Sequence, residues 1–411
     1  MQNLTQPTNV LFRPILLGAA GLLAAACSVS GGSDDGSGHG SGAHMAELSA
    51  DLTKLYLTNS DKDAMKVVDA RTLSSDESPE ALEQRAYIVS RDSGEVAFID
   101  LRSWEITRKR TYPVLKEVRL GKHPTHLSLS RDGAMLAVMN EDEGTGAVSF
   151  VDTATDVEMK RLGGFFTPHF MRFSHDGKFG FVANINAHHI SRVDLESLEI
   201  DRHIALDGFD GPPNETLAED EGGFGDAQID ADGMLFAAHH KTGRVMVYDT
   251  NKHEKRADMR AGKGPWIAFA EHPFFNLPRR TLVTNLGDKS VSVIGLDISP
   301  DVIGTLPGDE ESYGVNFSSL TPDKAFVMNR IRKDIAVMNT DRMIVEDRIP
   351  VGGNTETAAT TADGKYIIAA VSSANRVVVI DAMTNKIFKS YDNVGSYPWS
   401  VTIPGGQNYC H

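Results

Sequence analysis

Cysteine is scarce in this chain of 411 residues: there are two, Cys27 and Cys410, one near each end. A network of internal disulfides is therefore excluded, and we expect the fold to depend on its hydrophobic core. Apolar runs of about 18 residues, the length of a membrane-spanning helix, are missing after the N-terminal segment. Basic residues are also few, because 41 Lys and Arg stand against 56 Asp and Glu. The net charge of −15 makes nucleic acid a poor partner.

Helical periodicity and familiar catalytic motifs are missing too. No stretch keeps an apolar period of 3.6 residues over about three turns, so we expect no long helices. The chain contains no Gly-x-Ser-x-Gly, no His-Glu-x-x-His, no phosphate-binding loop and no Cys-x-x-Cys-His for covalent haem. These absences favour a non-catalytic protein, and an enzyme stays open as the alternative.

The N-terminus reads as a targeting segment. In "LFRPILLGAAGLLAAAC" (residues 11–27), Arg13 precedes an uncharged, mostly apolar stretch that ends at Cys27. The segment "LLAAAC" resembles a bacterial lipobox, and a Gly/Ser-rich stretch that cannot bury a core follows it. We expect residues 1–26 to be a lipoprotein signal peptide, Cys27 to be lipidated, and residues 27–50 to be a flexible tether. A plain secretory signal with an incidental cysteine is the alternative.

The predicted anchor implies a location. A lipidated Cys27 would hold the protein to a membrane of the bacterial cell envelope, on its periplasmic side. Ser28 after the cysteine favours the outer membrane. Membrane contact is therefore expected through the lipid anchor.

One pattern recurs through the body of the chain, as in "TPHFMRFSHDGKFGFVANINAHHISRVD" (residues 167–194). An alternating strand leads through an Asp-Gly turn to an apolar strand, a polar turn and a third strand. A short fourth strand follows, such as "LEIDRHIAL" or "NKIFKSY". The third strands end at residues 100, 152, 194, 249, 295, 339 and 381. Four short strands repeated at about 40–45 residues indicate the blades of a β-propeller.

We therefore predict an all-β fold: a single β-propeller of four-stranded antiparallel blades over residues 51–411. Seven units are visible if "MKVVDA" (residues 65–70) is the inner strand of the first. "KLYLTN" (residues 54–59) and "YPWSVTIPGGQNYCH" (residues 397–411) would then pair to close an eighth blade. If residues 52–85 are an irregular extension, the ring has seven blades. Eight is favoured, because pairing the N- and C-terminal strands removes exposed sheet edges.

The strands "LYLTN", "FVAN" and "LVTN", each followed by a polar turn and another strand, resemble the YVTN-type β-propeller repeat. The chain is also similar to the propeller of haem-containing nitrite reductases. The resemblance covers residues 52–409 and implies the fold, while function stays open, because propellers host many unrelated activities. It adds non-covalent haem to the candidate cofactors, with His126 or His169 as the axial ligand.

Candidate ligands gather at one face of the predicted ring. In an up-and-down blade, the beginning of the inner strand and the turn after the second strand lie at the same face, which we call the start face. We expect six residues there: His126, His169, Asp226, His239, His240 and Glu356. Imidazoles and carboxylates around one opening suit a divalent cation or copper. The alternative is that each is a hydrogen-bonded structural or solvated residue.

The last two residues, Cys410 and His411, are predicted to begin a strand of the closing blade, towards the opposite face. With the terminal carboxylate they form a second, weaker candidate for a soft-metal site. The alternative is a half-buried strand cysteine.

The preferred function is binding of a metal ion or a partner protein at the start face, as an accessory to a periplasmic metalloenzyme. The first alternative is an enzyme. It would be either a metal-dependent hydrolase or lactonase with Asp226 and Glu356 as metal ligands, or an oxidoreductase-related propeller that binds haem. The second alternative is a pure protein-interaction scaffold.

Overall fold

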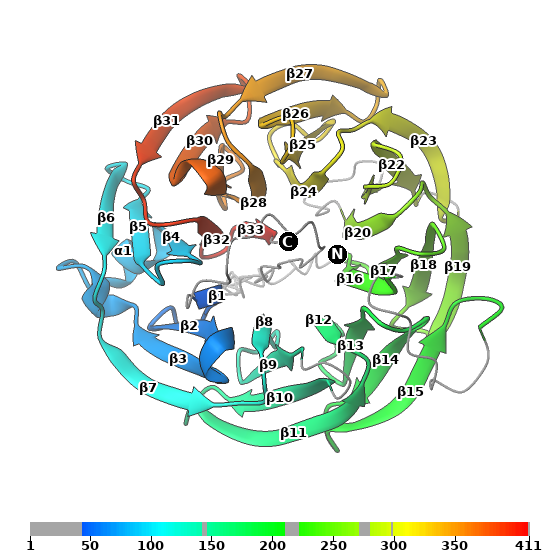
Figure 1. Ribbon diagram of the computed structural model, residues 1–411, viewed down its shortest axis with the longest axis horizontal. Helices are drawn as coiled ribbons and strands as arrows, with labels where there is room; N and C mark the ends of the chain where they lie inside the picture. Colours follow the sequence, from blue (N-terminus) through cyan, green and yellow to red (C-terminus); the bar gives the residue numbers. More distant parts are fainter. Residues whose placement is uncertain (1–42, 142–145, 210–221, 271–279, 297–298, 410–411) are drawn as a thin grey trace, which may run out of the picture.

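The computed structural model describes residues 43–141, 146–209, 222–270, 280–296 and 299–409. Eight antiparallel sheets are arranged as blades around a common centre, and the side of a blade that faces this centre is called its channel side (Figure 1). The predicted all-β propeller with eight blades is confirmed. The described residues contain only one short α-helix, α1 (Pro79–Glu83), and three 3-10 turns, at Ser60–Lys62, Arg71–Leu73 and Ser372–Ala374.

Of the four strands named below for each blade, the first lies nearest the centre of the ring and the last lies outermost. Blade 1 is β1 (Ala43–Leu48), β2 (Lys54–Asn59), β3 (Ala64–Asp69) and β7 (Val114–Arg119). Blade 2 is β8 (Pro124–Leu129), β9 (Met135–Asn140), β10 (Gly146–Asp152) and β11 (Val157–Phe165). Blade 3 is β12 (Pro168–Phe173), β13 (Phe179–Asn184), β14 (His189–Asp194) and β15 (Glu199–Ala205). Blade 4 is β16 (Phe224–Ile229), β17 (Met234–His239), β18 (Arg244–Asp249) and β19 (Glu254–Arg260).

The other half of the ring follows the same plan. Blade 5 is β20 (Pro265–Ala270), β21 (Arg280–Asn285), β22 (Ser290–Gly295) and β23 (Asp301–Pro307). Blade 6 is β24 (Ser312–Phe317), β25 (Lys324–Asn329), β26 (Asp334–Asn339) and β27 (Ile344–Pro350). Blade 7 is β28 (Thr355–Thr360), β29 (Tyr366–Val371), β30 (Arg376–Asp381) and β31 (Lys386–Asp392). Blade 8 is β32 (Pro398–Thr402), β4 (Arg85–Ser90), β5 (Val96–Asp100) and β6 (Glu105–Lys109).

The Asp-Gly turns join the first and second strands of a blade, as predicted. Gly133 adopts φ +73°, a left-handed conformation that glycine takes without strain. The carboxylate of Asp132 accepts a hydrogen bond from the backbone N–H of Ala134 at 3.1 Å. This pairing of residue types fixes the hairpin locally, and the same turn recurs in blades 3, 4 and 7.

The core lies between neighbouring blades. Side chains of the inner three strands are largely buried, whereas the outermost strands, such as β15, alternate between exposed and partly buried positions. Between blades 7 and 8, for example, Ile88 and Ile99 belong to the same buried cluster as Ile368 and Val379. Each sheet is therefore covered on both faces by its neighbours, which explains the near-continuous apolar runs.

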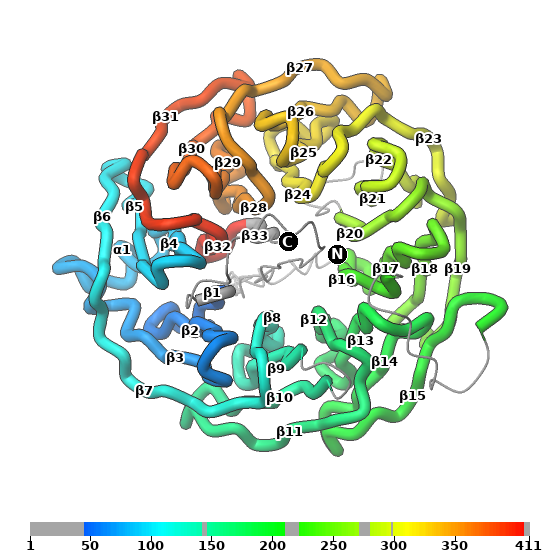
Figure 2. Tube along the Cα trace, viewed as in Figure 1, coloured from blue at the N-terminus to red at the C-terminus, as the bar shows by residue number. Residues whose placement is uncertain are grey.

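The ring closes through a C-terminal inner strand, as predicted, but this strand pairs with β4 and not with "KLYLTN". The inner strand of blade 8 is β32, which pairs with β4 in the register Val401↔Ile88 (Figure 2). The segment "KLYLTN" is β2 of blade 1, and "MKVVDA" contributes β3 of the same blade. The sequence pattern predicts "KLYLTN" in the closing eighth blade and "MKVVDA" as the inner strand of the first unit, so both strand assignments are wrong. An apolar pattern identifies a strand but not its sheet, and here residues 70–84 carry the chain from β3 of blade 1 to β4 of blade 8.

Two boundaries also differ from the prediction. The strand β1 begins at Ala43 and pairs with β2, for instance Glu47↔Tyr56, so the propeller starts before residue 51 and includes the last residues of the predicted tether. At the other end, β33 (Gln407–Tyr409) does not continue the closing blade. It pairs with the inner strand β28 in the register Ala359↔Asn408, which makes a fifth strand on the channel side of blade 7.

Several predictions concern residues outside those described. The signal peptide, Cys27, Cys410 and His411 belong to this group, and their predicted roles stay predictions. Within the described ranges, no helix is long and apolar enough to cross a membrane.

Candidate metal centre

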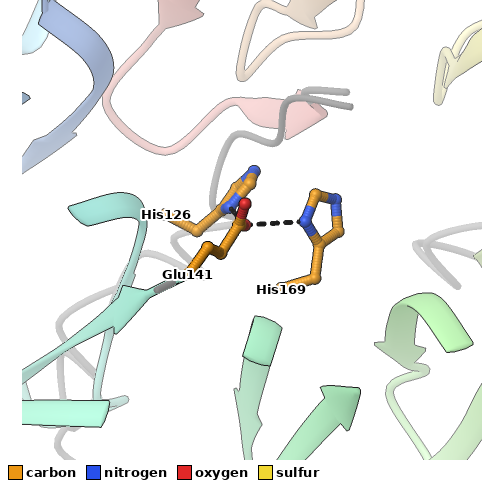
Figure 3. A group of neighbouring side chains, drawn as sticks. All are labelled: His126, Glu141 and His169. Atoms are coloured by element: carbon orange, nitrogen blue, oxygen red, sulfur yellow. Dashed lines mark hydrogen bonds and ion pairs between the residues drawn. The ribbon is translucent and has the colours of Figure 1, made fainter. Parts of the chain in front are cut away.

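Three side chains from two adjacent blades meet at the start face. His126 lies on β8, His169 lies on β12, and Glu141 directly follows β9. Nδ1 of His126 stands 2.9 Å from Oε1 of Glu141, and Nδ1 of His169 stands 2.8 Å from the same oxygen (Figure 3). Both imidazoles are buried. The inner strands place the two histidines side by side, and the turn after β9 brings the carboxylate between them.

A fourth group orients the carboxylate. The hydroxyl of Thr125 donates to Oε1 of Glu141 at 2.7 Å and also lies 2.9 Å from Nδ1 of His126. Burial by itself would raise the pKa of Glu141, but the neighbouring His169 and His126 reverse this and hold the pKa well below its usual range. The carboxylate is therefore an anion that three groups hold in place.

The arrangement satisfies the geometric needs of a metal ion. One donor atom from each of His126, Glu141 and His169 lies within 4.8 Å of the others. Ligands bound to a tetrahedral metal at about 2.0–2.2 Å stand roughly 3.3–3.6 Å apart, so the two N···O contacts of 2.9 and 2.8 Å, which are hydrogen bonds here, would lengthen slightly when a metal enters. Two histidines and one carboxylate are a common ligand set for zinc and for non-haem iron.

Asp226 and Glu356, predicted to join this group, lie elsewhere on the channel wall. Asp226 is fully buried, accepts from Nε2 of Gln228 at 3.1 Å and stands 3.7 Å from Nη2 of Arg172. Glu356 forms an ion pair with Nε of Arg330 at 2.7 Å. Each carboxylate thus has an arginine partner, and neither belongs to the three-residue cluster.

His239 and His240 also lie apart from the cluster. Nε2 of His239 is 2.9 Å from Nδ1 of His188, and the two rings are stacked. The ring of His240 packs edge-on against Trp266. Trp266 in turn lies 6.2 Å, between ring centroids, from His169. The histidines of blade 4 therefore form a separate aromatic group beside the cluster.

Buried histidines make the stability depend on pH. Burial lowers the pKa of His239 to about 3 and that of His189 to about 4. Such groups stay neutral in the folded protein but take up a proton in the unfolded chain below about pH 6.5, so their contribution to stability is lost as pH falls. Glu47 and Glu356, with pKa values raised to about 8 and about 7, act in the opposite direction.

A comparison with one variant isolates the histidine contribution. Between pH 7.5 and pH 5, wild type is expected to lose about 2 kcal/mol of unfolding free energy relative to His239→Gln. Urea denaturation at the two pH values measures this difference, and the effects of the two glutamates cancel because both proteins contain them. An equal pH dependence in the two proteins would show that His239 is not held neutral.

Glu141 is the residue that sequence reasoning missed. It follows the strand "MLAVMN" (residues 135–140) at the first position of the turn after the second strand. That turn was already placed at the start face, so a search for carboxylates as well as histidines in it would have found Glu141.

Known structures share the architecture. The dihydro-heme d1 dehydrogenase NirN in complex with DHE is 16% identical over 87% of this chain and 76% of its own, with a TM-score of 0.57. A Bacteroides fragilis protein proposed to be a 6-phosphogluconolactonase is 17% identical over 76% of this chain and 96% of its own, with a TM-score of 0.56. A Lactobacillus plantarum protein is 13% identical over 79% and 98%, with a TM-score of 0.57.

No family model and no curated protein matches the chain. At identities this low, the likeness to the solved structures shows the β-propeller fold alone.

Proposed function

We propose that this protein binds one divalent transition-metal ion between His126, Glu141 and His169. The observation that carries the proposal is the convergence of three donor atoms within 4.8 Å on rigid strand ends. Strands and tight turns hold ligands more firmly than long loops, so little reorganisation would accompany binding. Thr125 would keep the carboxylate oriented, as outer hydrogen-bond partners do at metal sites.

Binding without catalysis is favoured by the state of the other carboxylates. A lactonase-like site would need Asp226 and Glu356 as metal ligands, but both face arginines. We propose a role in holding or delivering a metal for a periplasmic partner protein. This role includes anchoring through Cys27 on the periplasmic side of the outer membrane.

A haem-type ligand is the second candidate. The observation in its favour is the pair of buried imidazoles at the channel wall beside Trp266, where an axial ligand would be needed. NirN, which shares the fold, was solved in complex with DHE. An absorption spectrum separates the two candidates, because a tetrapyrrole is coloured and a zinc protein is not.

Elemental analysis of the mature protein tests the proposal. Protein solubilised with detergent from the membrane fraction, without chelator or nickel resin, is expected to carry about one equivalent of zinc or iron. The double variant His126→Ala/His169→Ala is expected to lose it, whereas the control His203→Ala on the outer strand β15 retains it. Circular dichroism confirms that each variant folds. Metal retained in the double variant, or wild type that fails to bind added Zn²⁺ and Fe²⁺, would refute the site.

A further inference from the structure

A second group of charged and aromatic residues lines the channel wall across from the metal centre, on blades 6, 7 and 8 (Figure 1). Arg330 directly follows β25 and Arg91 directly follows β4. Both therefore hold the blade position that Glu141 holds after β9. Glu356 and Trp399 are the second residues of β28 and β32, the position that His169 holds in β12. The repeat thus brings these four side chains to the start face.

The two arginines are held in different ways. Nε of Arg330 lies 2.7 Å from Oε1 of Glu356, and its Nη1 lies 3.1 Å from Oε2 of Glu311. The guanidinium of Arg91 is stacked over Tyr397 at 4.2 Å and over Trp399 at 4.9 Å, measured to the ring centroids. Stacking positions Arg91 without neutralising it, and among the described residues its ion pair is with the exposed Asp92 at 3.3 Å.

Hydrogen-bonding capacity remains unused on this wall. Nε of Arg330 and Oε1 of Glu356 are close, yet they are not aligned as a hydrogen bond, and both atoms are buried. Nε1 of Trp399 is also buried, and within the described part of the chain it has no acceptor. A buried polar group without a partner is destabilising, so native proteins rarely leave several together. Two of the three groups are donors, which indicates a ligand that supplies acceptors.

The charge balance indicates the same class of ligand. Burial raises the pKa of Glu356 to about 7, although Arg330 and Arg91 lower it and Glu311 raises it. Near neutral pH a large share of the molecules therefore has Glu356 protonated. The other ionisable groups that face it are Tyr313 and Tyr397, which are neutral at this pH. Two arginines are then balanced by two carboxylates, Glu311 and the exposed Asp92, so protonation of Glu356 removes the excess negative charge that would repel an anion.

We infer that this wall is a binding site for an oxyanion ligand, held by the guanidinium groups of Arg91 and Arg330 and by the indole N–H of Trp399. The oxygen atoms of a carboxylate or a phosphate accept several charge-assisted hydrogen bonds from such groups. Glu356 takes up a proton when the anion binds, which frees Arg330 to pair with it. The site does not depend on the proposed metal.

Calorimetric titration of the metal-free full-length protein with succinate and with inorganic phosphate tests the inference. We expect saturable binding of at least one anion with Kd below about 1 mM at pH 7. The anion that binds with the lower Kd shows whether the site prefers a carboxylate or a phosphate. Titration in two buffers of different ionisation enthalpy is expected to show proton uptake, and the affinity is expected to rise from pH 8 to pH 6. Tryptophan fluorescence provides an independent readout.

Variants assign the binding to this wall. Arg91→Gln and Arg330→Gln are each expected to weaken binding at least 10-fold, while Glu356→Gln binds without proton uptake. The control is Arg110→Gln, whose side chain is exposed and pairs with Glu95 at the surface. If Arg330→Gln does not fold, the partly exposed Arg91 supplies the decisive variant.

Two outcomes would overturn the inference: no saturable binding of either anion up to about 10 mM, or binding that both arginine variants leave unchanged. Metal content separates this result from the metal proposal. Arg91→Gln is expected to keep the metal of wild type, so either site can fail without the other.

Discussion

Glu141→Gln is expected to lose at least about 100-fold in metal affinity, and its metal-free form is expected to be less stable than wild type, because the ionised carboxylate held by the two histidines is gone. The substitution keeps the shape of the side chain and leaves an amide oxygen that can accept from Thr125. It removes the negative charge that the two histidines hold in the ionised form. A divalent ion bound by two neutral imidazoles then lacks its anionic ligand.

Competition titration with a zinc-binding dye measures this affinity, and thermal melting of the metal-free protein measures stability. Glu311→Gln is the matched control, because Glu311 also lies at the start face but contacts Arg330 instead of the histidines. Glu141→Ala serves as a harsher test, since it removes the acceptor too and is expected to cost about 1–3 kcal/mol in the metal-free form. Unchanged zinc affinity in Glu141→Gln would place the metal elsewhere.

Deleting residues 398–411 is expected to abolish cooperative folding, whereas deleting residues 407–411 is expected to lower the melting temperature by only a few degrees. The longer deletion removes β32, the inner strand of blade 8, and with it the fully buried Trp399. Loss of one buried tryptophan side chain costs about 3–5 kcal/mol, a large part of the 5–15 kcal/mol that stabilises a typical domain. It also leaves β4 as an unpaired edge facing the channel.

The shorter deletion removes only β33, which is paired with β28 through three residue pairs and completes no blade. Circular dichroism melts and size-exclusion profiles of both proteins test the expectation. A cooperative transition within a few degrees of wild type after the longer deletion would mean that the ring does not need its C-terminal strand for closure.

Local sequence signals account for most of the blade architecture. Asp132-Gly133 fixes its turn through a left-handed glycine and a carboxylate that caps the backbone, so the hairpin can be predicted from neighbouring residues alone. The assignment of β2 and β3 to blade 1 could not be predicted in this way. All blades bury the same apolar pattern, and the choice between two neighbouring sheets depends on a connection, residues 70–84, that has no characteristic pattern.

The candidate metal centre was half predictable for a related reason. His126 and His169 stand six and seven residues before the Asp-Gly turns of two adjacent repeats, so the repeat predicts that both lie near one face. Their meeting with Glu141 depends on side-chain directions and on the closeness of blades 2 and 3, which the spacing does not specify. The pairing of Asp226 with Arg172 and of Glu356 with Arg330 could not be predicted for the same reason.

The sequence by itself determined most strands, the Asp-Gly turns, the propeller architecture and the face on which polar side chains gather, because each depends on residues close together in the chain, whereas it left seven and eight blades open. Tertiary structure alone decided which strands share blades 1 and 8, that β33 lines the channel, and which polar residues touch. These depend on contacts between segments far apart in the chain. The free energy of these contacts comes from packing and charge pairing between distant segments, so it cannot be predicted from a local sequence pattern.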